Sequence, residues 1–147
     1  MTRTFSVITD TATIVIFDLE AIRHRIADAP DWWSISQDEM LETNLGNIAF
    51  LGIGQDGEYL IKIVQDVEKA DGSLYLNFPS GQVFIGAGED TTGGGLEPDG
   101  TPSIQGQILQ FSPGSHCVKF KRNGTTLELS LTASQGGCNS ICEPFKL

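Results

Sequence analysis

The chain has 147 residues, a formal net charge of −10 and an isoelectric point near 4.4. Its length is typical of one domain, here residues 1–147. The negative charge argues against a nucleic-acid partner, because phosphates would repel it, and fits a basic protein partner or a cation. No apolar run approaches the roughly 18 residues of a membrane span, and the N-terminus lacks the pattern of a secretory signal. We therefore expect a cytoplasmic protein with no membrane partner.

The first two predicted strands cover residues 4–8 and 11–17. In the second of them, apolar side chains occupy both odd and even positions, so both faces of the strand are apolar. This pattern is typical of a strand that lies in the centre of a sheet or is covered by another element.

A short helical insert is expected near residues 19–43. Apolar residues recur there at helical spacing, at Leu19, Ile22 and Ile26. Further on, Ser36 and Glu39 form the S-x-x-E pattern of a capping box, which predicts a helix over residues 37–42.

Residues 52–57 spell G-x-G-x-x-G, the spacing of a dinucleotide-binding fingerprint. That fingerprint requires the loop to open a helix, whose N-terminus holds the pyrophosphate. Here the loop lies between two predicted strands, residues 47–51 and 58–64. We interpret the motif as a hairpin loop and expect no nucleotide.

A second predicted hairpin consists of residues 74–78 and 82–85, which alternate like paired strands. The turn Pro79-Ser80-Gly81 joins them, since proline presets its own φ and glycine tolerates a positive φ.

Asn123-Gly124 marks the third hairpin, because Asn-Gly favours a two-residue type I′ turn. It joins predicted strands at residues 115–121 and 125–131. The resulting register pairs Phe120 with Leu127, Val118 with Leu129, His116 with Leu131 and Lys119 with Glu128. His116 then faces the core, where we expect it to be packed and hydrogen-bonded.

With a further strand at residues 105–111, the sequence predicts eight or nine short strands and one helical insert. Turn signals separate these strands every 8–12 residues. The expected fold is therefore mainly β, an antiparallel β-sandwich, with a barrel as the alternative.

We expect no enzyme, since no recognised catalytic motif occurs and neither His24 nor His116 accompanies a nucleophile. We also expect no cofactor. Zinc is not expected, because His116 and Cys117 are adjacent and would point to opposite faces of a strand. Cys138 and Cys142 complete an odd set of three cysteines, for which reduced thiols are the default in a cytosol.

Residues 86–100 combine six glycines with four carboxylates, and no lysine or arginine occurs between Lys69 and Lys119. These carboxylates belong to Glu89, Asp90, Glu97 and Asp99. They are predicted to bind a basic protein partner. The alternative is a Ca²⁺-dependent ligand-binding module that uses the same oxygen atoms. A solvated loop without a ligand is the third interpretation.

Trp32 and Trp33 are the two tryptophans of the chain. One is expected to dock a helix onto the sheet, since large aromatic side chains are mostly buried. The other is a candidate anchor for the partner, because tryptophan is enriched among binding hot spots.

Three segments carry a resemblance to a known family: residues 17–21 leading to Trp32-Trp33-Ser34, residues 79–89, and residues 95–98. On these segments the chain resembles a family of small bacterial proteins without an assigned biochemical activity. Such proteins look like the immunity members of bacterial toxin–immunity pairs, including pairs encoded near type VI secretion genes. The resemblance implies a cytoplasmic inhibitor that binds and neutralises a cognate toxin, but it implies no particular interface residues.

Overall fold

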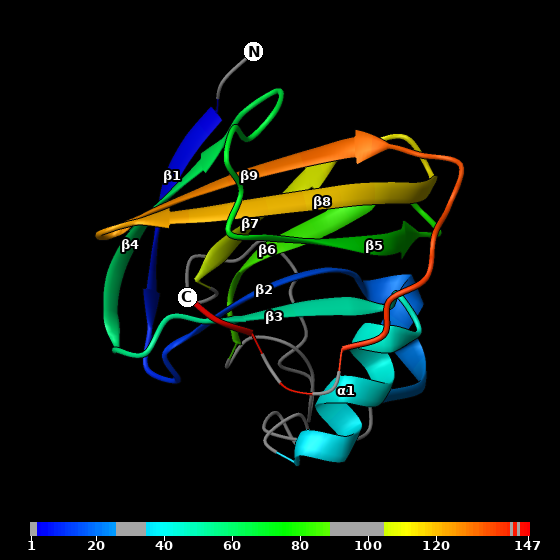
Figure 1. The fold of residues 1–147 in the computed structure, drawn as a ribbon, viewed down its shortest axis with the longest axis horizontal. Coiled ribbons are helices and arrows are strands. Elements are labelled where there is room, and N and C mark those ends of the chain that lie inside the picture. Colours follow the sequence, from blue (N-terminus) through cyan, green and yellow to red (C-terminus); the bar gives the residue numbers. More distant parts are fainter. Residues whose placement is uncertain (1–2, 26–34, 89–104, 142, 144) are drawn as a thin grey trace.

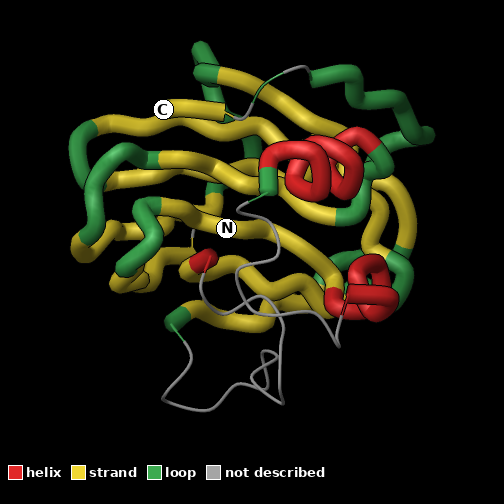
Figure 2. The backbone as a smooth tube through the Cα atoms, turned by 90° about the horizontal axis from the view of Figure 1, so that it is seen from below, coloured by secondary structure: helices red, strands yellow, loops and turns green. Residues whose placement is uncertain are grey.

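The computed structural model describes residues 3–25, 35–88, 105–141, 143 and 145–147. Their strands form two five-stranded sheets that pack face to face, and the helices lie together at one end of the sandwich (Figure 1, Figure 2). The prediction of a mainly β sandwich with a helical insert is confirmed.

One sheet, here called the β8 sheet, has the order β1 (Arg3–Thr9), β4 (Gly57–Ile63), β9 (Thr126–Ala133), β8 (Gly114–Asn123) and β5 (Gly72–Phe78). The other, the β2 sheet, has the order β10 (Phe145–Lys146), β3 (Ile48–Gly52), β2 (Thr13–Asp18), β6 (Gln82–Ala87) and β7 (Gly106–Gln110). The expected antiparallel order is incomplete, because β4 runs parallel to β9 and β10 runs parallel to β3. All nine predicted segments contain a strand, and β10 is an addition to them.

The main apolar core fills the space between the two sheets. Its fully buried members come from both sheets and include Val7, Ile14, Ile16, Ile61, Leu76, Ile85, Phe120 and Leu129. A second cluster covers the other face of the β2 sheet and contains Val15, Phe17, Ile22, Ile48, Phe50 and Phe84. Strand β2 lies in the centre of its sheet and is buried along its whole length, as the apolar character of both its faces predicts.

Two predicted hairpins are wrong. Strands β5 and β6 lie in different sheets, and so do β3 and β4, so the turns between them carry the chain from one sheet to the other. The turn at Ser80-Gly81 is held by a carboxylate from a third strand: the peptide N–H groups of Ser80 and Gly81 donate to Asp18 at 2.8 and 2.9 Å. The G-x-G-x-x-G loop does precede a strand, β4, as predicted.

The hairpin of β8 and β9 is present, but its register differs from the predicted one. Asn123 pairs with Thr126, so Gly124-Thr125 forms the turn, and Phe120 lies opposite Leu129. Lys121, not Lys119, is the residue opposite Glu128. The difference moves each pairing by two residues, which leaves every side chain on its predicted face because strand side chains alternate with a period of two. His116 is accordingly buried, and its ring lies 4.8 Å from that of Phe78.

The helical insert consists of a 3₁₀ helix, η1 (Leu19–Arg25), and an α-helix, α1 (Ser36–Asn44). The predicted capping box is wrong. Ile35 occupies the N-cap position, and no side chain caps the helix. The side chain of Glu39, expected to reach back to the helix start, is instead buried on the inner face of α1.

Candidate functional site

The residues predicted to bind a partner lie outside the described residues. They are Trp32, Trp33, Glu89, Asp90, Glu97 and Asp99. The acidic-loop interface and the Ca²⁺ alternative therefore stay predictions. The described part of the chain presents another candidate, built on α1 and the C-terminal segment that passes it.

Helix α1 presents leucine to solvent, whereas two of its three carboxylates are buried against the protein. Leu41 and Leu45, four residues apart and thus on one face, are 51% and 61% exposed, and Ile35 is 58% exposed. The opposite face of the helix carries three buried residues at spacings of three and four, Glu39, Glu42 and Thr43. This is the reverse of the usual pattern, in which the apolar stripe of a surface helix faces the core.

The buried carboxylate of Glu42 is stabilised by two polar neighbours. The Asn47 amide nitrogen Nδ2 donates to Glu42 Oε1 at 2.8 Å, and His24 Nε2 lies 2.8 Å from Oε2. His24 is half exposed, whereas the Glu42 side chain is nearly inaccessible. The contact therefore ties η1 to the inner face of α1 and positions the helix on the sandwich.

Glu39 lies on the same inner face, but its carboxyl group has no hydrogen-bond partner among the described residues. Burial raises the pKa of Glu39 to about 7, because desolvation disfavours the charged form. Its backbone carbonyl accepts a bond from Thr43 Oγ1 at 2.8 Å. The inner face of α1 thus contains a carboxyl group that is partly protonated near neutral pH.

The C-terminal segment, residues 134–141, connects the end of α1 to the edge strand β5. The side-chain amide of Asn44 bonds to both backbone groups of Ile141, at 3.1 and 2.8 Å. Asn139 Nδ2 donates to the carbonyls of Thr43, at 2.9 Å, and Tyr75, at 2.7 Å. The C-terminal segment therefore links the end of α1 to the edge of β5, and it runs from one to the other in Figure 1.

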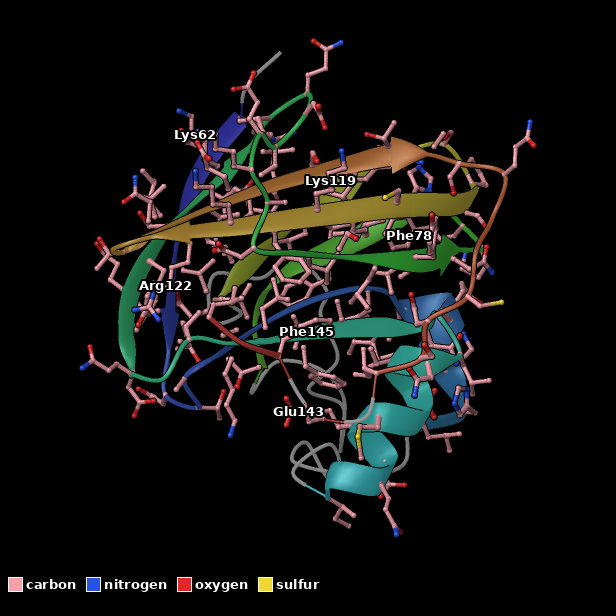
Figure 3. The ribbon with its side chains drawn as sticks, in the orientation of Figure 1. Lys62, Phe78, Lys119, Arg122, Glu143 and Phe145 are labelled. Carbon is pink, nitrogen blue, oxygen red and sulfur yellow. The ribbon has the colours of Figure 1, made fainter. Side chains whose placement is uncertain are left out.

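A shallow groove of about 460 Å³ lies between β5 and this segment. Its walls are residues 72–75 on one side and Cys138, Asn139, Ser140, Ile141 and Phe145 on the other. Glu143 and Phe145 lie on the part of the chain that passes α1 (Figure 3). We refer to the exposed face of α1 and this groove together as the α1–β5 surface.

A smaller pocket of about 120 Å³ lies at the end of β2, next to the turn after β5. Its polar groups already bond to one another. Asp18 accepts bonds from the turn at Ser80-Gly81 and from the Glu20 peptide N–H, and Glu20 forms an ion pair with Arg23. This volume holds only a few water molecules, so we do not treat the pocket as a ligand site.

Groups that could perform catalysis or bind a metal are sparse in the described part of the chain. No cluster of three or more histidine, cysteine or carboxylate side chains is placed to bind a metal there. His116 is buried, and its Nδ1 lies 3.1 Å from the Gly114 carbonyl oxygen. Cys117 and Cys138 are free thiols, and Cys142 lies outside the described residues. Among the described helices, none is long and apolar enough to cross a membrane.

The α1–β5 surface is not among the sites predicted from the sequence. The signal was present in the predicted helix itself, because Glu39 and Glu42 share a face opposite Leu41. Periodicity alone would have placed the leucine inside and the carboxylates outside, which is the usual arrangement.

Comparisons with known proteins give the fold and a family. No curated protein matches the chain. A solved structure titled "Crocagin biosynthetic gene J" has a similar fold, with a TM-score of 0.53 and 14% sequence identity over 91% of this chain and 96% of that one. The model of DUF6386, a family of unknown function, matches residues 1–147, and the chain therefore belongs to that family.

Proposed function

We propose that this protein is an immunity protein, a non-catalytic inhibitor that neutralises a cognate bacterial toxin in the cytoplasm by occluding it. The toxin would be one member of a toxin–immunity pair, as in type VI secretion systems. The observation that carries the proposal is the outward apolar face of α1, formed by Leu41 and Leu45 over buried carboxylates, with the exposed Ile35 at the N-cap.

The reversed helix costs stability in the isolated protein. Fully burying a leucine or isoleucine contributes about 1.5–3 kcal/mol, and this chain leaves three such side chains mostly in water. Burying carboxyl groups beneath them is also unfavourable unless they are paired or protonated. A partner that covers the outer face would recover the lost burial, which explains why an interaction surface favours this arrangement.

The net charge of −10 indicates the character of the partner. A basic toxin would be attracted over distances comparable to the Debye length, which accelerates its association with the inhibitor. A second copy of this chain carries the same negative charge and is a poorer candidate for the same surface.

Co-expression tests the proposal. The polypeptide encoded next to this chain's gene is expressed in a bacterial host, alone and together with this chain. We expect the neighbour alone to arrest growth, co-expression to restore growth, and the two chains to co-purify in a 1:1 complex. A neighbour that is harmless alone, or a toxic neighbour that this chain neither binds nor neutralises, would overturn the proposal.

A matched pair of variants tests the surface. The double substitution Leu41→Glu/Leu45→Glu should abolish protection by placing two charges at the centre of the contact. Ile8→Glu/Leu60→Glu should leave protection intact, because these side chains are comparably exposed, at 45% and 40%, but lie on β1 and β4. Equal protection by both double variants would contradict a role for α1.

A further inference from the structure

We propose that the edge of β5 at Ser73 binds an extended, cationic peptide segment, which adds to the β8 sheet as a further strand. This inference goes beyond the proposed function, because it holds whether or not the segment belongs to a toxin. It rests on three features of the described residues: peptide groups without a partner, a side-chain amide that bonds to the strand edge as a neighbouring strand would, and a partly apolar groove beside both.

The direction of the peptide groups along β5 follows from its contacts. β5 is an edge strand, and β8 is its neighbour on one side. The Tyr75 N–H donates away from β8, to Asn139 Oδ1 at 2.9 Å, and the Asn77 N–H donates to the Gly46 carbonyl at 2.8 Å. Because alternate residues of an antiparallel strand direct their peptide groups to the same side, the Ser73 N–H and C=O also point outward. They have no partner among the described residues, and Ser73 is exposed.

The Asn139 side chain shows that this edge accepts peptide-like groups. Its amide is chemically a peptide unit, and it accepts from the Tyr75 N–H and donates to the Tyr75 carbonyl at 2.7 Å. These are the two bonds that a neighbouring strand makes at such a position. Asn139 thus covers the edge at Tyr75 and leaves the equivalent position at Ser73 open. Strand addition to an exposed edge is a recurring mode of peptide recognition.

The walls of the groove select the side chains of the segment. Ile141 and Phe145 are partly buried and border the groove, so an inward-pointing side chain of the bound segment would meet apolar surface. Asp71, next in sequence to the groove residue Gly72, is exposed, and the whole chain has a net charge of −10, which favours a cationic segment. An extended segment in which valine alternates with lysine meets both requirements.

A short synthetic peptide tests the proposal by amide-resolved NMR. The probe is acetyl-Lys-Val-Lys-Val-Lys-amide, titrated into the full chain to about 1 mM, where even weak strand addition is detectable. Two further probes carry N-methyl groups on the odd or on the even residues, which removes alternate N–H donors and keeps the charge. We expect shifts at Ser73, Leu74 and Ser140 with the unmodified probe. One methylated probe should bind at least tenfold more weakly, and the other should bind as the parent does.

Two variants test whether the peptide binds at the edge of β5. Ser73→Pro removes the outward N–H, and Ser140→Trp fills the groove with a large side chain. Ser140 is exposed and has no hydrogen bond in the described structure, so at least one of the two variants should fold normally. Each folded variant should lose binding at least tenfold. Equal binding of all three probes would show attraction by charge alone and overturn the proposal, as would the absence of shifts. A dimer of the free chain that Ser140→Trp dissociates would assign the edge to a second copy and also overturn it.

Discussion

The side-chain amide of Asn139 bonds to both peptide groups of Tyr75, accepting from its N–H at 2.9 Å and donating to its C=O at 2.7 Å. Sixty-four residues separate the two in sequence. Asn139 also reaches the carbonyl of Thr43 at the end of α1. One side chain therefore joins the edge of the β8 sheet, the C-terminal segment and the helix that forms the α1–β5 surface.

Asn139→Asp should loosen this junction. The substitution keeps an acceptor for the Tyr75 N–H but places a carboxylate oxygen against the carbonyls of Thr43 and Tyr75. We expect a loss of about 2 kcal/mol in the free energy of unfolding and faster hydrogen exchange at the Tyr75 amide. Ser140→Ala, next in sequence, serves as the control and should change neither quantity. Unchanged exchange at Tyr75 in the aspartate variant would contradict the assigned role.

Glu39 should make stability depend on pH. Its pKa is raised to about 7 in the folded state, whereas an unfolded chain has the ordinary value near 4.5. Between these two values the folded state holds a proton that the unfolded state has lost, so the free energy of unfolding falls as pH rises through this window. The loss amounts to about 3 kcal/mol and is complete near pH 8.

Glu39→Gln removes this titration. Relative to the variant, the wild-type chain should lose stability between about pH 5 and pH 8, as measured by urea unfolding at several pH values. The other carboxyl groups titrate in both proteins and cancel in the difference. Parallel stability curves for the two proteins across this range would show that Glu39 has an ordinary pKa.

Asp18→Asn should destabilise the turn that carries the chain from β5 to β6. The Asp18 carboxylate accepts the peptide N–H groups of Ser80, Gly81 and Glu20, and an asparagine would direct an NH₂ group at some of these donors. We expect a loss of about 2–4 kcal/mol, since charge-assisted bonds to a buried carboxylate are strong. Asp66→Asn is the matched control, because Asp66 forms an exposed pair with Lys119, and it should cost under about 0.5 kcal/mol.

Arg122→Lys should separate the C-terminus from the hairpin of β8 and β9. Arg122 donates to the carbonyls of Ile53, Leu147 at 3.0 Å, and Gly124 at 2.9 Å. A lysine ammonium lacks the planar fork that reaches several acceptors at once, so we expect a loss of about 1–2 kcal/mol and fraying of the last residues. Arg23→Lys, in the exposed pair with Glu20, should be close to neutral in the same thermal unfolding measurement.

The sequence predicted where the strands lie better than how they pair. Alternation and turn residues located the nine segments, because side-chain periodicity is a local property. Pairing depends on distant groups. Nothing near Pro79-Ser80-Gly81 indicates that the Asp18 carboxylate will hold that turn, so the sequence of a crossing between sheets looks the same as that of a hairpin. In the hairpin of β8 and β9, two registers place the same side chains in the core, and alternation could not choose between them.

The α1–β5 surface was harder to predict than the fold. Its helix departs from the usual rule that apolar faces are buried, so that rule alone does not indicate the exposure of Leu41. The partners of Glu42 and Asn139 come from other parts of the chain, and residue type alone does not indicate them. The predicted interface residues, by contrast, were chosen from local charge and composition, and they stay predictions.

The path of the chain between the sheets has a consequence for its synthesis. The chain changes sheet at β1–β2, β3–β4, β5–β6, β7–β8 and β9–β10, while β8 and β9 lie between β4 and β5. A nascent polypeptide that ends before β8 therefore has β5 with no neighbouring strand, and such unpaired edges promote aggregation. Cooperative folding must wait until β8 and β9 have left the ribosome. Slow translation or early termination would consequently yield unfolded chains, which chaperones bind and proteases degrade, and not a partially active protein.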